Sequence, residues 1–303
     1  MLIVRSNHIT KSFNEPQGMY NFSVAKDIGW GAFISRTLIR QFYKRVLHRD
    51  YQMPLPTGLE ILLPPDNSFT SEVILTDANV DWGAEAEMAR HLDPKGVFLD
   101  VGAHIGYYSL YMRPLVQEVH AFEPDSRTLL HLRKNLDRHP GMHVHAEAVS
   151  DRPGKASFTL DQHAELSRME SAAPGAEGNR TEVTVVSLDE FAEPSQLAVT
   201  GIKIDVEGND YLVLQGANRL VARCQPLILT EAVANEALFR WAESHGYSVY
   251  ATVGDRASGL RTFRRLVEPG AAWTKMLFLV PQRLLPEFAR QGAGGRISGL
   301  RSS

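Results

Sequence analysis

Residues 97–106 carry the side chains most able to do chemistry, because an acid and two glycines follow a run of apolar residues. The apolar positions before Asp100 are typical of a strand that is buried on both faces of a parallel sheet. Gly102 and Gly106 bracket a tight turn in which the backbone can approach a ligand closely. The next apolar run ends at Glu123, whose carboxylate can accept hydrogen bonds from both hydroxyls of a ribose.

The spacing of these residues favours a particular kind of nucleoside ligand. Dinucleotide-binding folds use G-x-G-x-x-G, which seats a pyrophosphate on the N-terminus of a helix. Here the pattern is D-x-G-x-x-x-G, and Ala103, His104 and Ile105 fill the turn in place of the middle glycine. The pattern therefore predicts a ligand with a ribose but no pyrophosphate, such as S-adenosylmethionine. Asp100 is then expected to meet the ammonium of this ligand, directly or through water.

Three further polar residues are expected beside this crevice. His104 sits inside the turn, where it either caps the following helix or contacts the carboxylate of the ligand. Ser150 and Asp151 follow the third predicted strand, where they form either a plain turn or the rim next to the base ring of the ligand. The candidate cofactor-binding residues are therefore Asp100, Gly102, His104, Gly106, Glu123, Ser150 and Asp151.

A second strand carries charges where a central strand of a parallel sheet is normally apolar. In residues 202–208, I-K-I-D-V-E-G, every second position is charged, so Lys203, Asp205 and Glu207 share one face. Lys203 lies deepest and is placed to neutralise Asp205 or the acid of the first motif. Asp205 and Glu207 fall at the carboxyl end of the strand, where ligands bind in open α/β sheets, and Glu231 ends the next strand on the same rim.

These three carboxylates are the candidate catalytic residues. Asp205 is the best candidate for a general base or an acceptor-positioning group, with Glu207 or Glu231 assisting. Three carboxylates on one rim can also hold a divalent metal through oxygen ligands, but nothing in their spacing requires one. His143 and His145 alternate on one strand face, which is more typical of a half-exposed strand than of a metal site. No metal ligand is assigned.

Strands and helices alternate around both motifs, which predicts a doubly wound parallel sheet with right-handed crossovers. The predicted strands cover residues 97–101, 119–122, 143–149, 202–206, 227–230, 247–253 and 275–280. The predicted helices between them cover residues 105–113, 126–138, 210–221 and 234–245. Residues 153–161 and 181–187 alternate like an inserted antiparallel β-hairpin.

These elements divide the chain into three parts: an N-terminal α/β appendage over residues 1–90, an S-adenosylmethionine-binding domain over residues 91–282, and a disordered tail over residues 283–303. Within the appendage, every fourth residue from Ile34 to Val46 is apolar, while Arg36, Arg40 and Lys44 lie opposite. This pattern predicts an amphipathic helix with a basic outer face. Such a helix can be docked with a solvated face, cover an acidic substrate, or contact a membrane surface.

Composition limits the class of protein. The chain has 303 residues and a net charge of −3, which gives no support for a nucleic-acid-binding surface. Its one cysteine, Cys224, allows no internal disulfide. No window is long and apolar enough for a transmembrane helix, and the N-terminus does not resemble a secretory signal, so a cytoplasmic protein is expected. A homo-oligomer is compatible with this composition.

The motifs together resemble the FkbM-type S-adenosylmethionine-dependent methyltransferases. The resemblance covers about residues 81–231 and rests on F-L-D-V-G-A-H-I-G-Y-Y-S-L-Y, H-A-F-E-P, A-V-S-D, V-S-L-D-E-F and I-K-I-D-V-E-G-N-D-Y-L-V-L-Q-G-A. His104 stands where the family has an asparagine, and Asn209 where it has an acid. The resemblance implies a Rossmann-like, seven-stranded, mostly parallel sheet of the class I methyltransferase type, with an antiparallel last strand.

The resemblance also implies methyl transfer, usually to a hydroxyl of a sugar, glycolipid or polyketide-type metabolite. A small-molecule or glycosylated acceptor is therefore expected. A sulfonium methyl is already activated, so the protein has to hold the acceptor in line and remove its proton. The alternatives are a NAD-dependent oxidoreductase and a non-enzymatic nucleotide-binding module. The missing middle glycine disfavours the first, and the retained polar residues at the strand ends disfavour the second.

Overall fold

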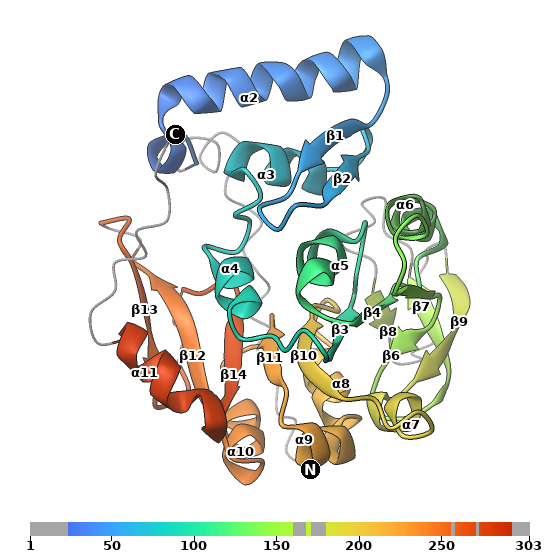
Figure 1. The fold of residues 1–303 in the computed structure, drawn as a ribbon, viewed down its shortest axis with the longest axis vertical. Helices are drawn as coiled ribbons and strands as arrows, with labels where there is room; N and C mark the ends of the chain where they lie inside the picture. The colour runs from blue at the N-terminus through green and yellow to red at the C-terminus, as the bar shows by residue number, and fades with distance from the viewer. Residues whose placement is uncertain (1–23, 160–167, 171–179, 256–257, 271–272, 293–303) are drawn as a thin grey trace, which may run out of the picture.

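An eight-stranded sheet forms the centre of the computed structural model, which describes residues 24–159, 168–170, 180–255, 258–270 and 273–292 (Figure 1). The strands lie in the order β13-β12-β14-β11-β10-β3-β4-β5. The five strands from β11 to β5 pair in parallel, whereas β14 pairs antiparallel with both β11 and β12. The parallel strands are β3 (Val97–Val101), β4 (Glu118–Phe122), β5 (Met142–His145), β10 (Val199–Ile204) and β11 (Leu227–Thr230).

The predicted α/β class with a mostly parallel sheet is confirmed, but the sheet has one strand more than the expected seven. The antiparallel edge consists of β12 (Tyr247–Gly254), β14 (Leu277–Pro281) and the additional strand β13 (Arg261–Leu266), which pairs with β12. Only Phe263 and Leu266 of β13 are buried, and the other positions are polar. An edge strand with so few apolar residues lacks the pattern by which buried strands are recognised.

Helices cover both faces of this sheet and close a separate core on each. One core joins the sheet to α4 (Ala84–Ala89), α5 (Tyr107–Met112), α6 (Ser126–Leu136) and α11 (Leu285–Gly292). The other core joins it to α7 (Leu188–Ala192), α8 (Asp210–Gln215), α9 (Asn218–Cys224) and α10 (Glu236–Ser244). The predicted doubly wound arrangement is thus present, although the single helix expected over residues 210–221 is divided at Gly216 and Ala217 into α8 and α9.

The predicted hairpin belongs to a second sheet of four strands, in the order β6-β9-β7-β8. Strands β7 (Gly154–Thr159) and β9 (Arg180–Val186) pair antiparallel, as expected, and β8 (Arg168–Glu170) pairs antiparallel with the other side of β7. The strand predicted over residues 143–149 is divided between the two sheets, because β6 (Ala148–Val149) leaves β5 and pairs in parallel with β9.

The N-terminal segment forms a layer over α5 and α6. Strands β1 (Tyr51–Pro54) and β2 (Glu60–Leu63) make an antiparallel hairpin, followed by α3 (Phe69–Thr76). The Asn135 side chain of α6 holds this hairpin, since its amide accepts from Leu62 N at 2.8 Å and donates to Leu62 O at 3.1 Å. Figure 1 shows α2 (Trp30–Phe42) beyond α3 and the hairpin, at one end of the molecule.

The predicted orientation of the amphipathic helix α2 is wrong. Its arginines face the protein: Arg40 is 4% exposed and donates to the carbonyls of Pro65 and Asn67, each at 3.0 Å. Arg36 donates to the Leu75 carbonyl at 2.9 Å, in the last turn of α3. Carbonyls at a helix end lack partners within the helix, so they attract cationic side chains. These hydrogen bonds turn the apolar face of α2 outward.

The C-terminal segment also differs from its prediction. Residues 285–292 form helix α11 where a disordered tail was expected from residue 283, and Phe288 is fully buried against the sheet. Residues 293–303 lie outside the described residues. The division of the chain at residues 90 and 282 stays a prediction. Among the described residues, no helix combines the length and the apolar character needed to cross a bilayer.

Candidate active site

The glycine turn between β3 and α5 adopts the left-handed backbone that its sequence indicates. Gly102 has φ 75°, and a Cβ there would lie 1.9 Å from the backbone oxygen of Asp205, so only glycine lets the two candidate loops touch. Gly106 has φ 89°, and a Cβ would lie 2.4 Å from Leu136 Cδ1. The second glycine therefore serves the packing of α5 on α6 as well as the turn.

Glu123 closes this turn from the end of β4. Its carboxylate accepts from the backbone N–H of His104 at 3.0 Å and from that of Asp125 at 2.8 Å. Burial raises the pKa of Glu123 to about 7, although these two hydrogen bonds oppose the shift. A carboxylate oxygen can accept more than one hydrogen bond, so both oxygens can still receive a donor from a ligand.

His104 links the turn to the N-terminal layer. Its φ is 53°, and its Nε2 lies 3.0 Å from the Asn67 amide nitrogen. Its ring also meets the Phe69 ring edge-on, with centroids 5.3 Å apart. The segment before α3 therefore lies beside the predicted cofactor position, which local sequence patterns did not indicate.

Lys203 joins the two candidate motifs. The ammonium donates to the Gly102 carbonyl at 2.6 Å and lies 3.6 Å from Asp100 and 3.7 Å from Asp205. Lys203 was predicted to neutralise either Asp205 or Asp100, and it lies close enough to pair with both. Burial alone would lower the pKa of Lys203, but the carboxylates of Asp205 and Asp100 raise it, so the side chain stays charged.

Asp100 is enclosed at the end of β3. It is fully buried, and Ser109 donates a hydrogen bond to its Oδ2 at 2.6 Å. With Lys203 on its other side, this carboxylate is placed to fix the lysine and the first turn of α5. Its predicted contact with the ligand ammonium, directly or through water, stays a prediction.

The three candidate catalytic carboxylates come together at the carboxyl ends of β10 and β11. Asp205, Glu207 and Glu231 each place one carboxylate oxygen within 4.8 Å of the others, and all three are partly exposed. Glu207 has φ 49°, a conformation that non-glycine residues rarely adopt. The arrangement can accept a proton, hold a hydroxyl group, or bind a divalent cation through oxygen.

Two further acids, which the sequence analysis did not assign to the site, lie close to this rim. Asp81 accepts from the Tyr108 hydroxyl at 2.7 Å, and burial, followed by the charges of Glu72 and Asp205, raises the pKa of its carboxyl. Burial, and then Asp205, raises the pKa of Asp210 to about 6. In the structure, α4 begins at Ala84, which leaves Asp81 in the loop before it.

Ser150 and Asp151 directly follow β6 in the chain. Ser150 N donates to Val186 O at 3.0 Å, and its hydroxyl donates to Asp151 at 3.2 Å. The Ser150 carbonyl packs against Gly216, where a Cβ would approach it to 2.1 Å. These contacts tie the pair to β9 and to the junction of α8 and α9, so their predicted place beside the base ring stays a prediction.

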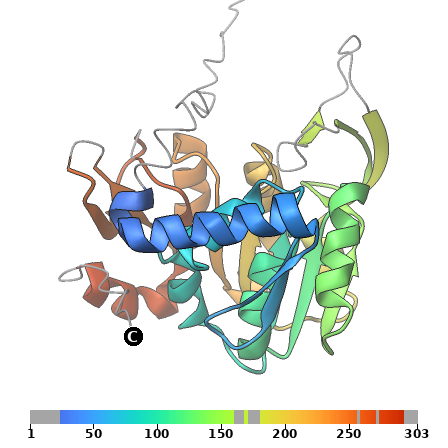
Figure 2. The ribbon, with the colours of Figure 1, turned by 90° about the horizontal axis from the view of Figure 1, so that it is seen from above.

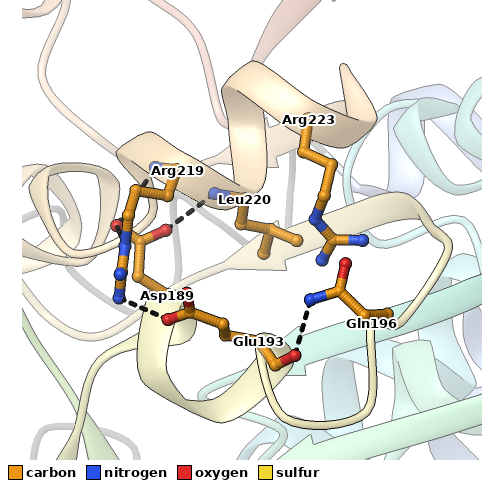
Figure 3. A pocket seen from close by; sticks show the side chains of 6 residues that line it. All are labelled: Asp189, Glu193, Gln196, Arg219, Leu220 and Arg223. Atoms are coloured by element: carbon orange, nitrogen blue, oxygen red, sulfur yellow. Dashed lines mark hydrogen bonds and ion pairs between the residues drawn. The ribbon is translucent and has the colours of Figure 1, made fainter.

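A polar pocket between α7 and α9 is lined by none of these residues (Figure 3). Figure 3 shows Asp189 and Glu193 of one helical segment facing Arg219 of the other; the Arg219–Glu193 distance is 2.9 Å. Gln196 and Arg223 of this pocket precede β10 and β11, which places it at the amino edge of the sheet. Ligands of open α/β sheets bind at the carboxyl edge, so this pocket is not the candidate site.

Comparisons with known proteins give a match to one family model and matches to several solved structures. The family model for the methyltransferase FkbM domain matches residues 100–249, which include both motifs. No curated protein matches the chain. Among solved structures, it resembles a methyltransferase FkbM from Methylobacillus flagellatus at 18% identity and a TM-score of 0.42, covering 69% of this chain and 52% of that one. The chain thus spans about half the length of that relative.

Two other solved structures match the chain at lower identity. A precorrin-6y C5,15-methyltransferase from Geobacter metallireducens has 16% identity and a TM-score of 0.33, with 65% of this chain and 84% of that one covered. A tRNA (uracil-54, C5)-methyltransferase from Pyrococcus abyssi has 14% identity and a TM-score of 0.38, with 66% and 39% covered.

Proposed function

Since residues 100–249 form a domain of the FkbM methyltransferase family, we propose that the chain transfers the methyl group of S-adenosylmethionine to a hydroxyl group. The observation that carries this proposal is the meeting of the glycine turn with three carboxylates. Gly102 lies against the backbone of Asp205, whose side chain is grouped with Glu207 and Glu231. The glycine turn and a set of proton acceptors therefore share one edge of the sheet.

The residues present suit this cofactor. Glu123 offers two carboxylate oxygens to the ribose hydroxyls, and the glycine turn leaves room for the backbone to approach. The carboxylates of Asp205, Asp100, Asp81 and Glu231 all raise the pKa of the Lys203 ammonium, so this single cation is outnumbered by acids. This excess of negative charge favours a ligand that is cationic at its sulfonium and ammonium groups. When bound, the cofactor supplies an electrophilic methyl group.

Asp205 is the proposed general base. Lys203 stabilises its charged form, and the side chain is 36% exposed, so the carboxylate can reach a bound acceptor. A hydroxyl loses its proton as its oxygen attacks, and a carboxylate held at that oxygen can take the proton. Glu207 and Glu231 are placed to orient the acceptor or to share the proton.

A small-molecule or glycosylated acceptor is part of the proposal. The net charge of −3 and the acidic rim disfavour a polyanionic nucleic acid. The expected location in the cytoplasm rests on the sequence alone. Loss of activity on addition of a chelator, with recovery on addition of magnesium, would show that a divalent metal takes part in the reaction.

Transfer of a labelled methyl group tests the proposal. The protein is incubated with methyl-labelled S-adenosylmethionine and a panel of sugars, glycolipids and polyketide-type alcohols, and the product is located by carbon NMR. We expect a methyl group bound to oxygen, and Asp205→Asn is expected to lower kcat about a hundredfold or more with little change in cofactor affinity. A methyl group on nitrogen or carbon, or on nucleic acid, would contradict the proposed acceptor.

A further inference from the structure

Helix α2 and the turn after it carry an exposed apolar stripe. The stripe consists of Trp30, Ile34, Leu38, Phe42 and Val46, whose exposed fractions range from 50% to 64%. Ile39 and Leu47 border it and are also exposed. Large apolar side chains grouped on one side of an exposed helix indicate an interaction site, whereas single exposed ones are common.

The body of the protein fixes this orientation. Arg36 and Arg40 bind the carbonyls of Leu75, Pro65 and Asn67, and Arg40 also donates to the Ser71 hydroxyl at 3.1 Å. A rotation of α2 that buried the apolar stripe would break these hydrogen bonds and leave a buried arginine without acceptors. Figure 2 looks onto this end of the molecule and shows α2 in front of the other described elements.

The charged residues of the segment that carries the stripe are all cationic, and the acids beside it, Asp27, Asp50 and Asp77, are each paired with a basic side chain. Residues 28–49 contain five arginines and lysines and no aspartate or glutamate, although the whole chain is acidic. Two of the five, Arg36 and Arg40, face the protein, while Lys44, Arg45 and Arg49 are exposed at the end of the helix. The apolar stripe therefore ends in a cationic group that has no acidic neighbour within this segment.

We propose that this face docks on an anionic lipid surface. The combination of an apolar face containing tryptophan and phenylalanine with lysine and arginine beside it is typical of helices that lie in the plane of a membrane interface. The opposite charge of the lipid headgroups complements Lys44, Arg45 and Arg49. A second copy of the chain complements this face less well. Its residues 28–49 offer the same apolar stripe but contain no acidic side chain to pair with these cations.

Docking at this face would bring the lipid surface to the side of the molecule that borders the cofactor turn. Arg40 of α2 binds the carbonyl of Asn67, and the side chain of Asn67 contacts His104 in that turn. The docking itself does not depend on the proposed methyl transfer.

Flotation of the full chain with lipid vesicles tests the proposal in the absence of cofactor and acceptor, so the result is separate from that for methyl transfer. Vesicles of phosphatidylcholine alone are compared with vesicles that also contain phosphatidylglycerol. We expect binding to the anionic vesicles that weakens as salt rises. Ile34→Ser/Leu38→Ser and Lys44→Ser/Arg45→Ser/Arg49→Ser should each lower the bound fraction about tenfold.

Matched controls use exposed residues elsewhere. Leu130→Ser/Val267→Ser and Arg240→Ser/Arg264→Ser/Arg265→Ser remove two apolar and three cationic side chains, respectively, from other surfaces and should bind like the unmodified chain. Brominated acyl chains should quench tryptophan emission, and Trp30→Phe should abolish this quenching. Failure of the unmodified chain to float, or a dimer in solution that Ile34→Ser/Leu38→Ser dissociates, would overturn the proposal. Loss of binding in the control variants would do the same.

Discussion

Lys203 connects the glycine motif of β3 with the charged motif of β10. Its ammonium lies between Asp100 and Asp205 and holds the Gly102 carbonyl at 2.6 Å. Asp100 has no exposed surface, so removal of the lysine leaves a carboxylate buried without its cation. A buried ion pair of this kind contributes little net stability when whole, but the loss of one partner is costly.

We therefore predict that Lys203→Met lowers the free energy of unfolding by about 3–5 kcal/mol. The double variant Lys203→Met/Asp100→Asn should recover at least about 1 kcal/mol of this loss, because the remaining side chain no longer carries a charge. Urea denaturation of the two single variants and the double variant measures the coupling. Additive losses would show that Lys203 and Asp100 are not paired.

Cofactor affinity should depend on pH through Glu123. Burial raises the pKa of Glu123 to about 7, and ribose hydroxyls donate to its charged form, so affinity should rise with pH up to about 7 and level off above it. Glu123→Gln should bind S-adenosylmethionine about 1.5–3 kcal/mol more weakly and lose this pH dependence. Calorimetric titration between pH values of about 6 and 8.5 measures both. The same pH profile in the variant would place the titrating group elsewhere.

Acid should destabilise the fold through the histidines on β4 and β5. His120 stacks on His143 and His145, and burial followed by the charges of these neighbours lowers the pKa of His120 to about 3. Glu118 lies 3.6 Å from its Nε2. The unfolded chain binds a proton at its ordinary pKa of about 6.5, so this group destabilises the folded state as pH falls from about 6.5 toward about 3.

In His120→Phe this contribution is absent. The difference in free energy of unfolding between the unmodified chain and the variant should therefore change by about 1.4 kcal/mol per pH unit between pH values of about 6 and 4. The exposed residue His48 provides the control, and His48→Gln should follow the unmodified chain. A difference that does not vary with pH would contradict the lowered pKa.

At the scale of elements, the contact between two loops decides which glycine is essential. Gly102 and Gly208 both have positive φ, 75° and 90°, but only Gly102 has backbone atoms where a Cβ would lie. Gly208→Ala should cost about 1–2 kcal/mol, the usual strain of a left-handed alanine. Gly102→Ala should cost more, because the loop after β10 must move. Urea denaturation of both variants compares them, and equal losses would argue against the close approach.

Helix α2 shows what a periodic pattern leaves undetermined. The spacing of Ile34, Leu38, Phe42 and Val46 predicted a helix with two unlike faces, and that helix is present. The pattern alone does not say which neighbour the helix meets. The carbonyls of Pro65, Asn67 and Leu75 attract the arginines, and these contacts come from residues 25 to 39 positions away in the chain.

At the scale of the whole molecule, the sequence predicted those parts of the fold and the site that depend on buried strands and short motifs. The parallel strands, their glycine turn and the rim of carboxylates were found because each lies in a local pattern. Strand β13 was missed because its apolar residues are few, and Asp81 because its partner Tyr108 is distant in the chain. Local patterns do not report such contacts.

The central claim is that this sheet edge binds S-adenosylmethionine rather than a dinucleotide. Calorimetric titration of the full chain with S-adenosylmethionine, S-adenosylhomocysteine, NAD and ATP tests it most directly. We predict that the first two ligands bind, and that NAD and ATP do not bind comparably, because the turn lacks the middle glycine that seats a pyrophosphate. Tighter binding of NAD than of S-adenosylmethionine would contradict the account.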